Sequence, residues 1–445
     1  MKSSSRLNLF DLTMIVVSLV IGMGIFRTPA NVAQQAGSAD MFFLAWIVGG
    51  LVALCGALCY AEIGSRYPVT GGYYKIFSYC YHPSIAFAIN CIILVSNAAS
   101  LAGVALIGSE YIANVFFKGS TDLNLTKQII STIAVIVFYG VNLMGLKMSS
   151  RTQNVLTVIK IGLVIFLISA LFTGDYAAPL TSANSAEHDI MTTVRAFGAC
   201  LVAVSFTYGG YQQTINFGGE VKNPAKILPK GIFFGIAIIM LLYLTINYTY
   251  YKVIGFENLK GAKSIAAILA GKLFGENGYT IVSVLLFLSV LAYVNALLLS
   301  NPRVMYAMSD EGVLPAVFKK VTPKKNVIMV SLSAFAALSL ITLWYAETFD
   351  EILDHTIFLD SIGMATSTAT IFILRKRGIG EDVKDSYRMK LYPLLPLVFI
   401  AAYIFIATCI AFNTPKAAWV SALVFSVFFI LYFVLRLFRK SPQPN

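Results

Sequence analysis

Residues 16–37 read VVSLVIGMGIFRTPANVAQQAG, and this stretch decides how the rest of the chain is organised. It begins as a hydrophobic helix, meets two glycines at Gly22 and Gly24, and continues as a more polar helix. At membrane depth such an interruption leaves backbone groups without partners, so it persists only where it lines a cavity or where a ligand replaces the missing bonds. Paired glycines also allow close helix packing, so this pair alone leaves both interpretations open.

A second interruption of the same kind lies in the other half of the chain. Residues 208–210 read Tyr-Gly-Gly, roughly 190 residues after the first glycine pair and again within a long apolar stretch. Interrupted apolar segments at corresponding places in two halves are the best sequence indicator of a transporter's binding site. We therefore predict that the two breaks face each other and form such a site.

The composition is that of a polytopic membrane protein. Of the 445 residues, 58% are hydrophobic and 12% are charged, and the mean hydropathy is +0.77. A soluble domain carries about a quarter charged residues. The sequence contains no HExxH, P-loop or GxSxG motif, and its cysteines lack the spacing of a zinc site. We therefore expect no enzymatic activity, no cofactor and no metal.

The basic residues indicate the topology. Of the 33 Lys and Arg residues, we place 23 on one side of the membrane, 8 on the other and 2 within spans. An excess of Lys and Arg marks the cytoplasmic side, so both termini are predicted to be cytoplasmic, in the plasma or inner membrane of the cell. The net charge of +12 then reflects topology and contact with anionic lipids, and we expect no nucleic-acid partner.

Apolar runs predict an all-α membrane protein with twelve transmembrane helices. The predicted helices cover residues 9–36, 41–64, 84–117, 128–146, 153–173, 195–217, 229–254, 278–303, 326–346, 352–374, 392–412 and 418–438. Two repeats of five spans, 9–173 and 195–374, would have opposite topologies because five is odd. We predict one transporter domain (1–445) with this 5+5 inverted repeat, broken helices 1 and 6, and two additional helices at 392–438.

Three connecting segments have distinctive patterns. Residues 60–73 are turn-rich and are interpreted either as a gate beneath the bundle or as an ordinary membrane-edge loop. Residues 264–274 are apolar at helical spacing over a run too short to span a membrane, which predicts an amphipathic helix. Residues 375–390 are densely charged, which predicts a solvated linker before the last two helices.

Two facing breaks favour a small zwitterion as the ligand. The half-helix after a break presents unpaired N–H groups at the positive end of its dipole, and the half-helix before it presents carbonyls. The site thus offers donors to a carboxylate and acceptors to an ammonium group. Residues 21–26 and 206–211 contain no acidic or basic side chain, so main-chain atoms would do most of the recognition of an α-amino acid.

Several ordered motifs resemble the amino acid–polyamine–organocation (APC) superfamily, and within it the L-type amino acid transporter branch and its prokaryotic relatives. These motifs are residues 20–26 (VIGMGIF), residues 206–211 (FTYGGY), Glu220 with Asn223-Pro224, and Asn295, Arg303 and residues 311–315 (EGVLP). The resemblance covers essentially the whole chain. It implies the LeuT/APC-type fold.

The resemblance also implies roles for residues at the two breaks. The main chain of Gly22, Met23 and Gly24 would bind the substrate carboxylate. The carbonyls that would bind the substrate ammonium belong to Ile21, Phe206, Thr207 and Gly209. Phe206 matches an aromatic residue that closes over the substrate, with ordinary packing as the alternative in a chain that contains 32 Phe.

Lys160 lies inside the fifth predicted helix, where a lysine costs on the order of 3 kcal/mol unless it has a partner or snorkels to the interface. In the L-type branch a lysine of this helix stands where sodium-coupled relatives hold a cation between helices 1 and 8. The resemblance therefore implies a sodium-independent transporter with Lys160 as the coupling residue. Whether Lys160 exchanges a proton is left open, as is the choice between exchange and proton-coupled uptake.

Arg27 and Asp360 are opposite charges that we expect at similar depth in the outer half of the membrane. Lone charges at that depth are most cheaply accommodated by pairing. Sodium-coupled symporters of similar fold pair an Arg after the helix 1 break with an Asp of helix 10. We hypothesise that Arg27 and Asp360 form an outer gate when substrate is bound, with Glu110 as the rival partner of Arg27.

The sequence thus predicts a secondary amino acid permease or exchanger that moves small, neutral L-amino acids by alternating access. Neutral substrates are favoured because the central parts of helices 3, 6 and 8 offer no charged side chain. Ser96, Asn97 and Ser100 form a polar patch that either contacts the substrate side chain or joins helices.

The alternatives are a cationic amino acid or polyamine permease, with Glu110 or Asp360 at the second amine, and a channel or transporter-derived nutrient sensor. Residues 118–127 contain no cysteine, whereas animal members of the L-type branch link to a heavy chain through a cysteine in this loop. We therefore expect no disulfide-linked heavy chain.

Overall fold

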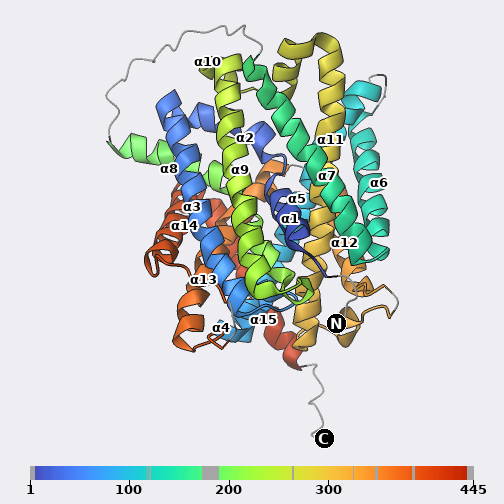
Figure 1. The fold of residues 1–445 in the computed structure, drawn as a ribbon, viewed down its shortest axis with the longest axis vertical. Coiled ribbons are helices and arrows are strands. Elements are labelled where there is room, and N and C mark those ends of the chain that lie inside the picture. The colour runs from blue at the N-terminus through green and yellow to red at the C-terminus, as the bar shows by residue number, and fades with distance from the viewer. Residues whose placement is uncertain are drawn as a thin grey trace, which may run out of the picture.

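The computed structural model describes residues 6–117, 119, 122–172, 190–262, 265–323, 325–345, 349–382 and 386–437. These residues form a bundle of long helices (Figure 1), with two isolated β-bridges among the described residues. Within these described ranges, ten helices are long and apolar enough to cross a membrane, or eleven when the bent pair α1 and α2 counts as one span. The protein is therefore an all-helical, multi-pass membrane protein.

The helices follow one another along the chain with short connections. In chain order they are α1 (Leu9–Val20), α2 (Gly24–Ala36), α3 (Ala39–Arg66), α4 (Gly72–Cys80), α5 (Pro83–Phe116), α6 (Leu123–Leu143), α7 (Leu146–Ile168), α8 (Ile190–Tyr208), α9 (Pro224–Ile254), α10 (Phe256–Leu259), α11 (Ile265–Asp310), α12 (Met329–Tyr345), α13 (Phe349–Lys376), α14 (Leu394–Asn413) and α15 (Pro415–Leu437). α1 begins and α15 ends at the same end of the bundle (Figure 1), which we call the terminal end.

The first predicted break is confirmed. α1 starts at a capping box, in which Asn8 and Asp11 bond each other's main chain, and it ends at Val20. The chain resumes as α2 at Gly24, bent by 41° from α1. α2 then leads away from the terminal end (Figure 1).

The second break is also present, but its second half differs from the prediction. α8 ends at Tyr208, and Gly210 has φ +114°, a conformation that glycine adopts without strain. Residues Tyr211–Asn216 then form a 3₁₀ helix instead of the predicted α-helix. The side chain of Gln212 accepts the Gly210 N–H at 2.8 Å, so local bonds replace the i→i−4 ladder at this turn.

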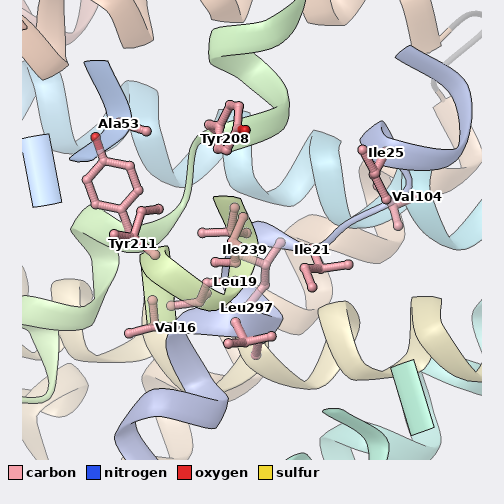
Figure 2. Close-up of a cluster of buried hydrophobic side chains, with 14 of the residues drawn as sticks. Val16, Leu19, Ile21, Ile25, Ala53, Val104, Tyr208, Tyr211, Ile239 and Leu297 are labelled. Atoms are coloured by element: carbon pink, nitrogen blue, oxygen red, sulfur yellow. The ribbon is translucent and has the colours of Figure 1, made fainter. Parts of the chain in front are cut away.

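Small residues allow α1 to pack closely against α9. A Cβ added to Gly235 of α9 would lie 2.4 Å from Val16, and one added to Gly231 would lie 2.7 Å from Leu12. Above this contact, the helix ends at the two breaks are enclosed by buried side chains (Figure 2). Those side chains include Leu19, Ile21, Tyr208, Tyr211, Ile239 and Leu297.

Most predicted helix positions are confirmed to within a few residues. The amphipathic helix predicted at 264–274 is the first part of α11, which continues into a long span after a non-helical residue at Gly275. The predicted residues 173, 264, 346 and 438 lie outside the described residues. Twelve spans remain a prediction, because α12 has only 17 residues, a length of about 25 Å against a hydrocarbon thickness of about 30 Å.

The prediction for residues 60–73 is wrong in its local structure. α3 stays helical as far as Arg66, and α4 begins at Gly72, so the turn is confined to the few residues between them. The run from Tyr60 to Arg66 is buried. Because buried main-chain groups need partners, continued helix satisfies them where a turn-rich loop would not.

The contact between α1 and α9 predicts a clear difference between two glycines. Gly235→Ala is expected to lower the midpoint of thermal unfolding in detergent, because the added methyl group collides with Val16 and overpacking costs about 1–3 kcal/mol. Gly162→Ala on α7 is the control, since nothing lies within 4 Å of its added Cβ. Equal midpoints for the two variants would contradict this packing.

Candidate functional site

A cavity of about 420 Å³ lies against both helix breaks. Its walls come from α1, α2, α5, α8, α11, α13 and α14, together with the segment that follows α8. The lining residues are Leu19, Val20, Gly22, Met23, Gly24, Arg27, Thr28, Asn31, Gln34, Gln35, Ile93, Ser96, Asn97, Ser100, Val104, Ile107, Ala199, Val202, Ala203, Ser205, Phe206, Thr207, Gly209, Gly210, Gln212, Gln213, Tyr293, Ile357, Asp360, Ser361 and Tyr403. The cavity thus follows α2 from the first break, away from the terminal end.

The two breaks are in direct contact. A Cβ added to Gly24 would lie 3.1 Å from the side chain of Thr207, and one added to Gly210 would lie 2.3 Å from the Leu19 carbonyl oxygen. The hydroxyl of Tyr243, on α9, lies 3.1 Å from the Val20 carbonyl and 3.3 Å from the Thr207 carbonyl. One buried hydroxyl therefore serves the last turn of α1 and the last turn of α8 together.

Some main-chain groups at the breaks are left available to a ligand. The N–H groups of Met23 and Gly24 have no hydrogen-bond partner among the described residues, and both residues line the cavity. They are also at the N-terminal end of α2, where the helix dipole favours an anion. The first break thus offers two donors and a positive dipole end to a carboxylate.

Six of the seven predicted substrate-binding residues line the cavity. They are Gly22, Met23, Gly24, Phe206, Thr207 and Gly209. The Phe206 carbonyl also accepts the Gly209 N–H at 3.2 Å. Ile21 is fully buried and is not among the lining residues.

Ile21 lies off the cavity wall because its carbonyl bonds the buried Lys160 side chain. Its ammonium group donates to the Ile21 carbonyl and lies 3.4 Å from Ser18 Oγ and 3.5 Å from the Ser18 carbonyl. The Lys160 side chain is fully buried, which excludes snorkelling to the interface. α7 therefore supplies a hydrogen-bond donor that satisfies the carbonyl end of the broken α1 helix.

Arg27 and Asp360 both line the cavity, Arg27 as an exposed residue and Asp360 as a half-buried one. No ion pair joins these two side chains in this structure, in which both residues are described. Glu110 lies 3.4 Å from Lys127, so the rival partner of Arg27 has a cation of its own.

The polar patch on α5 takes both of its predicted roles. Ser96, Asn97 and Ser100 line the cavity. Asn97 also hydrogen-bonds Asn301 at 2.6 Å, and Ser100 hydrogen-bonds Tyr293 at 2.8 Å, which joins α5 to α11.

Sequence reasoning missed several polar lining residues, among them Gln212, Gln213, Tyr293 and Tyr403. The glutamines could have been found, because two carboxamides directly after a glycine pair in an apolar span are costly and mark functional positions. The two tyrosines gave no such signal, since the chain contains 23 Tyr.

Aromatic side chains close the cavity toward the terminal end. The rings of Tyr60 and Tyr73 stack with centroids 6.4 Å apart, and both hydroxyls hydrogen-bond Ser367 of α13. The Tyr73 N–H donates to the Asn216 side chain at 3.0 Å, which ties α4 to the second break. The segment of residues 60–73 therefore packs beneath the cavity and is not a peripheral loop.

A buried carboxylate fastens the terminal ends of α3 and α13. Glu62 is fully buried and accepts from Arg66 Nε at 2.7 Å, from both Nε (2.8 Å) and Nη2 (2.7 Å) of Arg375, and from the Met389 N–H at 2.8 Å. The predicted solvated linker at 375–390 is therefore wrong at Arg375 and Met389. A buried charge is tolerable only with such partners, which hold this part of the segment against α3.

Two more ion pairs lie at the terminal end. Arg303 binds Glu220 through Nε at 2.9 Å and Nη2 at 2.5 Å, and its guanidinium lies over the Phe217 ring at 4.5 Å. Lys75 of α4 binds Asp310 of α11 at 2.5 Å. The cavity is thus open along α2, whereas ion pairs and stacked rings close the terminal end of the bundle.

Comparison with known proteins agrees with this geometry. Residues 7–436 match the family model described as "Amino acid permease". The chain is 32% identical over 406 residues to the serine/threonine exchanger SteT of Bacillus subtilis, a match that covers 89% of each chain.

Two further relatives are more distant. The human large neutral amino acids transporter small subunit 2 is 24% identical over 437 residues, which cover 96% of this chain and 80% of the relative. The methylthioribose transporter of Bacillus subtilis is 25% identical over 459 residues, which cover 97% and 94%. The family is one of transporters, not enzymes, and with a family match over nearly its whole length, the chain belongs to the amino acid permease family of the APC superfamily.

Proposed function

We propose that this permease moves small, neutral L-amino acids across the cell membrane by alternating access, as a sodium-independent exchanger. The observation that carries the proposal is the cavity at the two breaks, with free N–H groups of Met23 and Gly24 on its wall. These groups suit a carboxylate, and carbonyls of the second break suit an ammonium group. A zwitterion held in this way leaves its side chain to the rest of the cavity.

The charge of the cavity favours neutral substrates. Arg27 and Asp360 are the charged side chains that line it, one of each sign. The lining therefore offers no excess of either charge to a substrate side chain. The names of the relatives give different substrates, so the substrate class is inferred from the cavity lining. The similarity to the serine/threonine exchanger, at 32% identity, supports a small neutral amino acid.

Lys160 supports sodium independence. Its ammonium group lies among the Ser18 hydroxyl, the Ser18 carbonyl and the Ile21 carbonyl. Oxygen ligands of this kind are those that a hard cation requires. An ammonium group supplied by the protein occupies them, so transport does not need a cation from solution at this position.

We propose the same architecture that the sequence predicts. We propose that α12 is a twelfth span, that residues 9–173 and 195–374 are inverted repeats, and that residues 392–438 are two additional helices. Both termini would lie in the cytoplasm, because the terminal end carries most of the Lys and Arg residues. The cavity would then open to the outside, and we expect transport without a disulfide-linked heavy chain.

Exchange is tested directly with purified protein in liposomes. Radiolabelled L-threonine or L-serine outside is expected to accumulate about tenfold faster when the liposomes contain unlabelled amino acid, because the loaded carrier returns more readily than the empty one. Replacing external Na⁺ with choline should leave the rate unchanged. Uptake that requires Na⁺, or that is independent of internal substrate, would contradict the proposal, and preferential inhibition by putrescine or lysine would favour the cationic alternative.

Lys160→Met is expected to reduce uptake by about tenfold or more. The substitution removes a charge-assisted hydrogen bond to the Ile21 carbonyl, and such bonds contribute about 1.5–3 kcal/mol. Lys147→Met, at the exposed start of the same helix, is the matched control and should transport normally. Normal initial rates for Lys160→Met at equal protein density would show that this contact is dispensable.

The outer gate remains a proposal for the substrate-bound state. Arg27 and Asp360 face the same cavity, and closure around substrate would bring their charges together. Arg27→Asp and Asp360→Arg are each expected to reduce uptake about tenfold, because like charges then meet in a poorly solvated site. The double charge swap should recover part of this loss, and a swap no better than either single variant would rule out the pair.

A further inference from the structure

Three carboxamides connect α11, α5 and the second break in one hydrogen-bonded chain. Asn301 Nδ2 donates to the Leu297 carbonyl at 3.0 Å. Asn97 Nδ2 donates to Asn301 Oδ1 at 2.6 Å, and Gln213 Nε2 donates to Asn97 Oδ1 at 3.2 Å. We call this chain of Asn301, Asn97 and Gln213 the amide relay.

The relay has a fixed direction. A backbone carbonyl can only accept, so the amide nitrogen of Asn301 must face Leu297 and its oxygen must face Asn97. The same logic orients Asn97 and then Gln213. Reversing any one amide would set two acceptors or two donors against each other, so each amide is held by its neighbour.

The relay ends in an acceptor that has no donor. Gln213 Oε1 is buried without a hydrogen-bond partner among the described residues, although the Gln213 side chain lines the main cavity. Gln213 as a whole is only 8% exposed. A buried acceptor left without a donor destabilises the protein, so a ligand that supplies a donor would recover this free energy.

A second, smaller cavity places this acceptor beside the substrate cavity. It has a volume of about 20 Å³ and is lined by all three residues of the amide relay. The residues that it shares with the main cavity are Ile93, Asn97, Gln212, Gln213 and Asp360. This volume suits one water-sized group. Asp360 has no hydrogen-bond or ion-pair partner among the described residues, so two of the residues that line the small cavity carry unpaired acceptors, and the cavity has room for one small donor.

We propose that the amide relay is the specificity determinant of this permease. Gln213 Oε1 accepts a hydrogen bond from a donor on a short substrate side chain, and it thereby selects hydroxylated amino acids over apolar ones of equal size. Asn97 and Asn301 act as positioning residues that hold the Gln213 oxygen toward the cavity. The inference rests on the proposed function, since it concerns the side chain of an amino acid bound at the breaks.

Such a site is expected to discriminate strongly between substrate side chains of equal size. A cavity that is merely apolar separates side chains of equal size poorly, whereas a buried polar group rejects an analogue that leaves it unpaired. Threonine and valine are a suitable pair, because a methyl group replaces a hydroxyl at nearly constant shape. A hydroxyl group is also small enough for the 20 Å³ cavity, which a longer polar chain is not.

The test compares inhibition constants of L-threonine and L-valine against uptake of labelled L-serine in proteoliposomes. The wild-type protein is expected to bind threonine about tenfold more tightly than valine. Gln213→Met retains the length of the side chain but removes the acceptor, so the two constants should converge to within about twofold through weaker threonine binding. Gln128→Met on α6, away from the cavity lining, is the control and should keep the wild-type ratio.

Asn301→Leu provides a second variant that leaves Gln213 intact. Without the carboxamide that bonds the Leu297 carbonyl, the amide relay loses its fixed direction. The preference for threonine should therefore fall, while the inhibition constant of valine stays unchanged. If Asn301 had a merely structural role, Asn301→Leu would instead weaken the binding of threonine and of valine equally. Asn301→Gln, which keeps a carboxamide at this position, is expected to rescue part of the preference for threonine.

The outcomes separate this inference from the proposed function. Amino acid uptake without a preference for threonine, or a preference that survives Gln213→Met, would overturn the inference and leave the proposed function standing. Tighter binding of L-2,3-diaminopropionate than of L-serine would assign the selection to Asp360 and an ammonium group, which also overturns it. Absence of uptake of every amino acid would overturn the proposed function itself.

Discussion

Broken helices inside a membrane must satisfy their backbone groups without water, and this constraint governs the centre of the protein. Tyr243 serves two carbonyls, one from each break, and Lys160 serves a third. Gly24 and Gly210 let the two chain segments approach more closely than side chains would allow. The N–H groups of Met23 and Gly24 remain, and the cavity lies against them. Among the described residues these two N–H groups have no hydrogen-bond partner, so a substrate carboxylate can use them.

The two ends of the bundle are built from different chemistry. Amides and hydroxyls line the open cavity, whereas ion pairs close the terminal end, with Glu62 between Arg66 and Arg375 and with Glu220 bound to Arg303. Buried ion pairs gain little net free energy, because desolvation offsets much of the attraction. Such contacts are specific in geometry yet moderate in strength, which suits a barrier that opens in the alternating-access cycle we propose. Stacking of Tyr60 on Tyr73 adds an apolar seal above them.

The sequence allowed the elements to be predicted well, because hydropathy and glycine pairs report directly on membrane helices and their breaks. The first break at Gly22 and Gly24 followed from these patterns, whereas the cavity position of Phe206 followed from the resemblance to the L-type branch. The position of Lys160 beside Ile21 did not, because a contact between helices far apart in sequence depends on packing. The 3₁₀ helix after Gly210 was missed, because helix periodicity does not reveal a local hydrogen bond such as the one from the Gly210 N–H to the Gln212 side chain.

The central claim is that main-chain groups at the two breaks bind both charged ends of an amino acid. Competition between a free amino acid, its methyl ester and its N-acetyl derivative for uptake tests this claim directly. Each derivative removes one charge and leaves the side chain unchanged, so each is expected to bind about tenfold or more weakly than the free amino acid, given about 1.5–3 kcal/mol for a charge-assisted hydrogen bond. Equal competition by either derivative would show that the corresponding end of the zwitterion is not bound at the breaks.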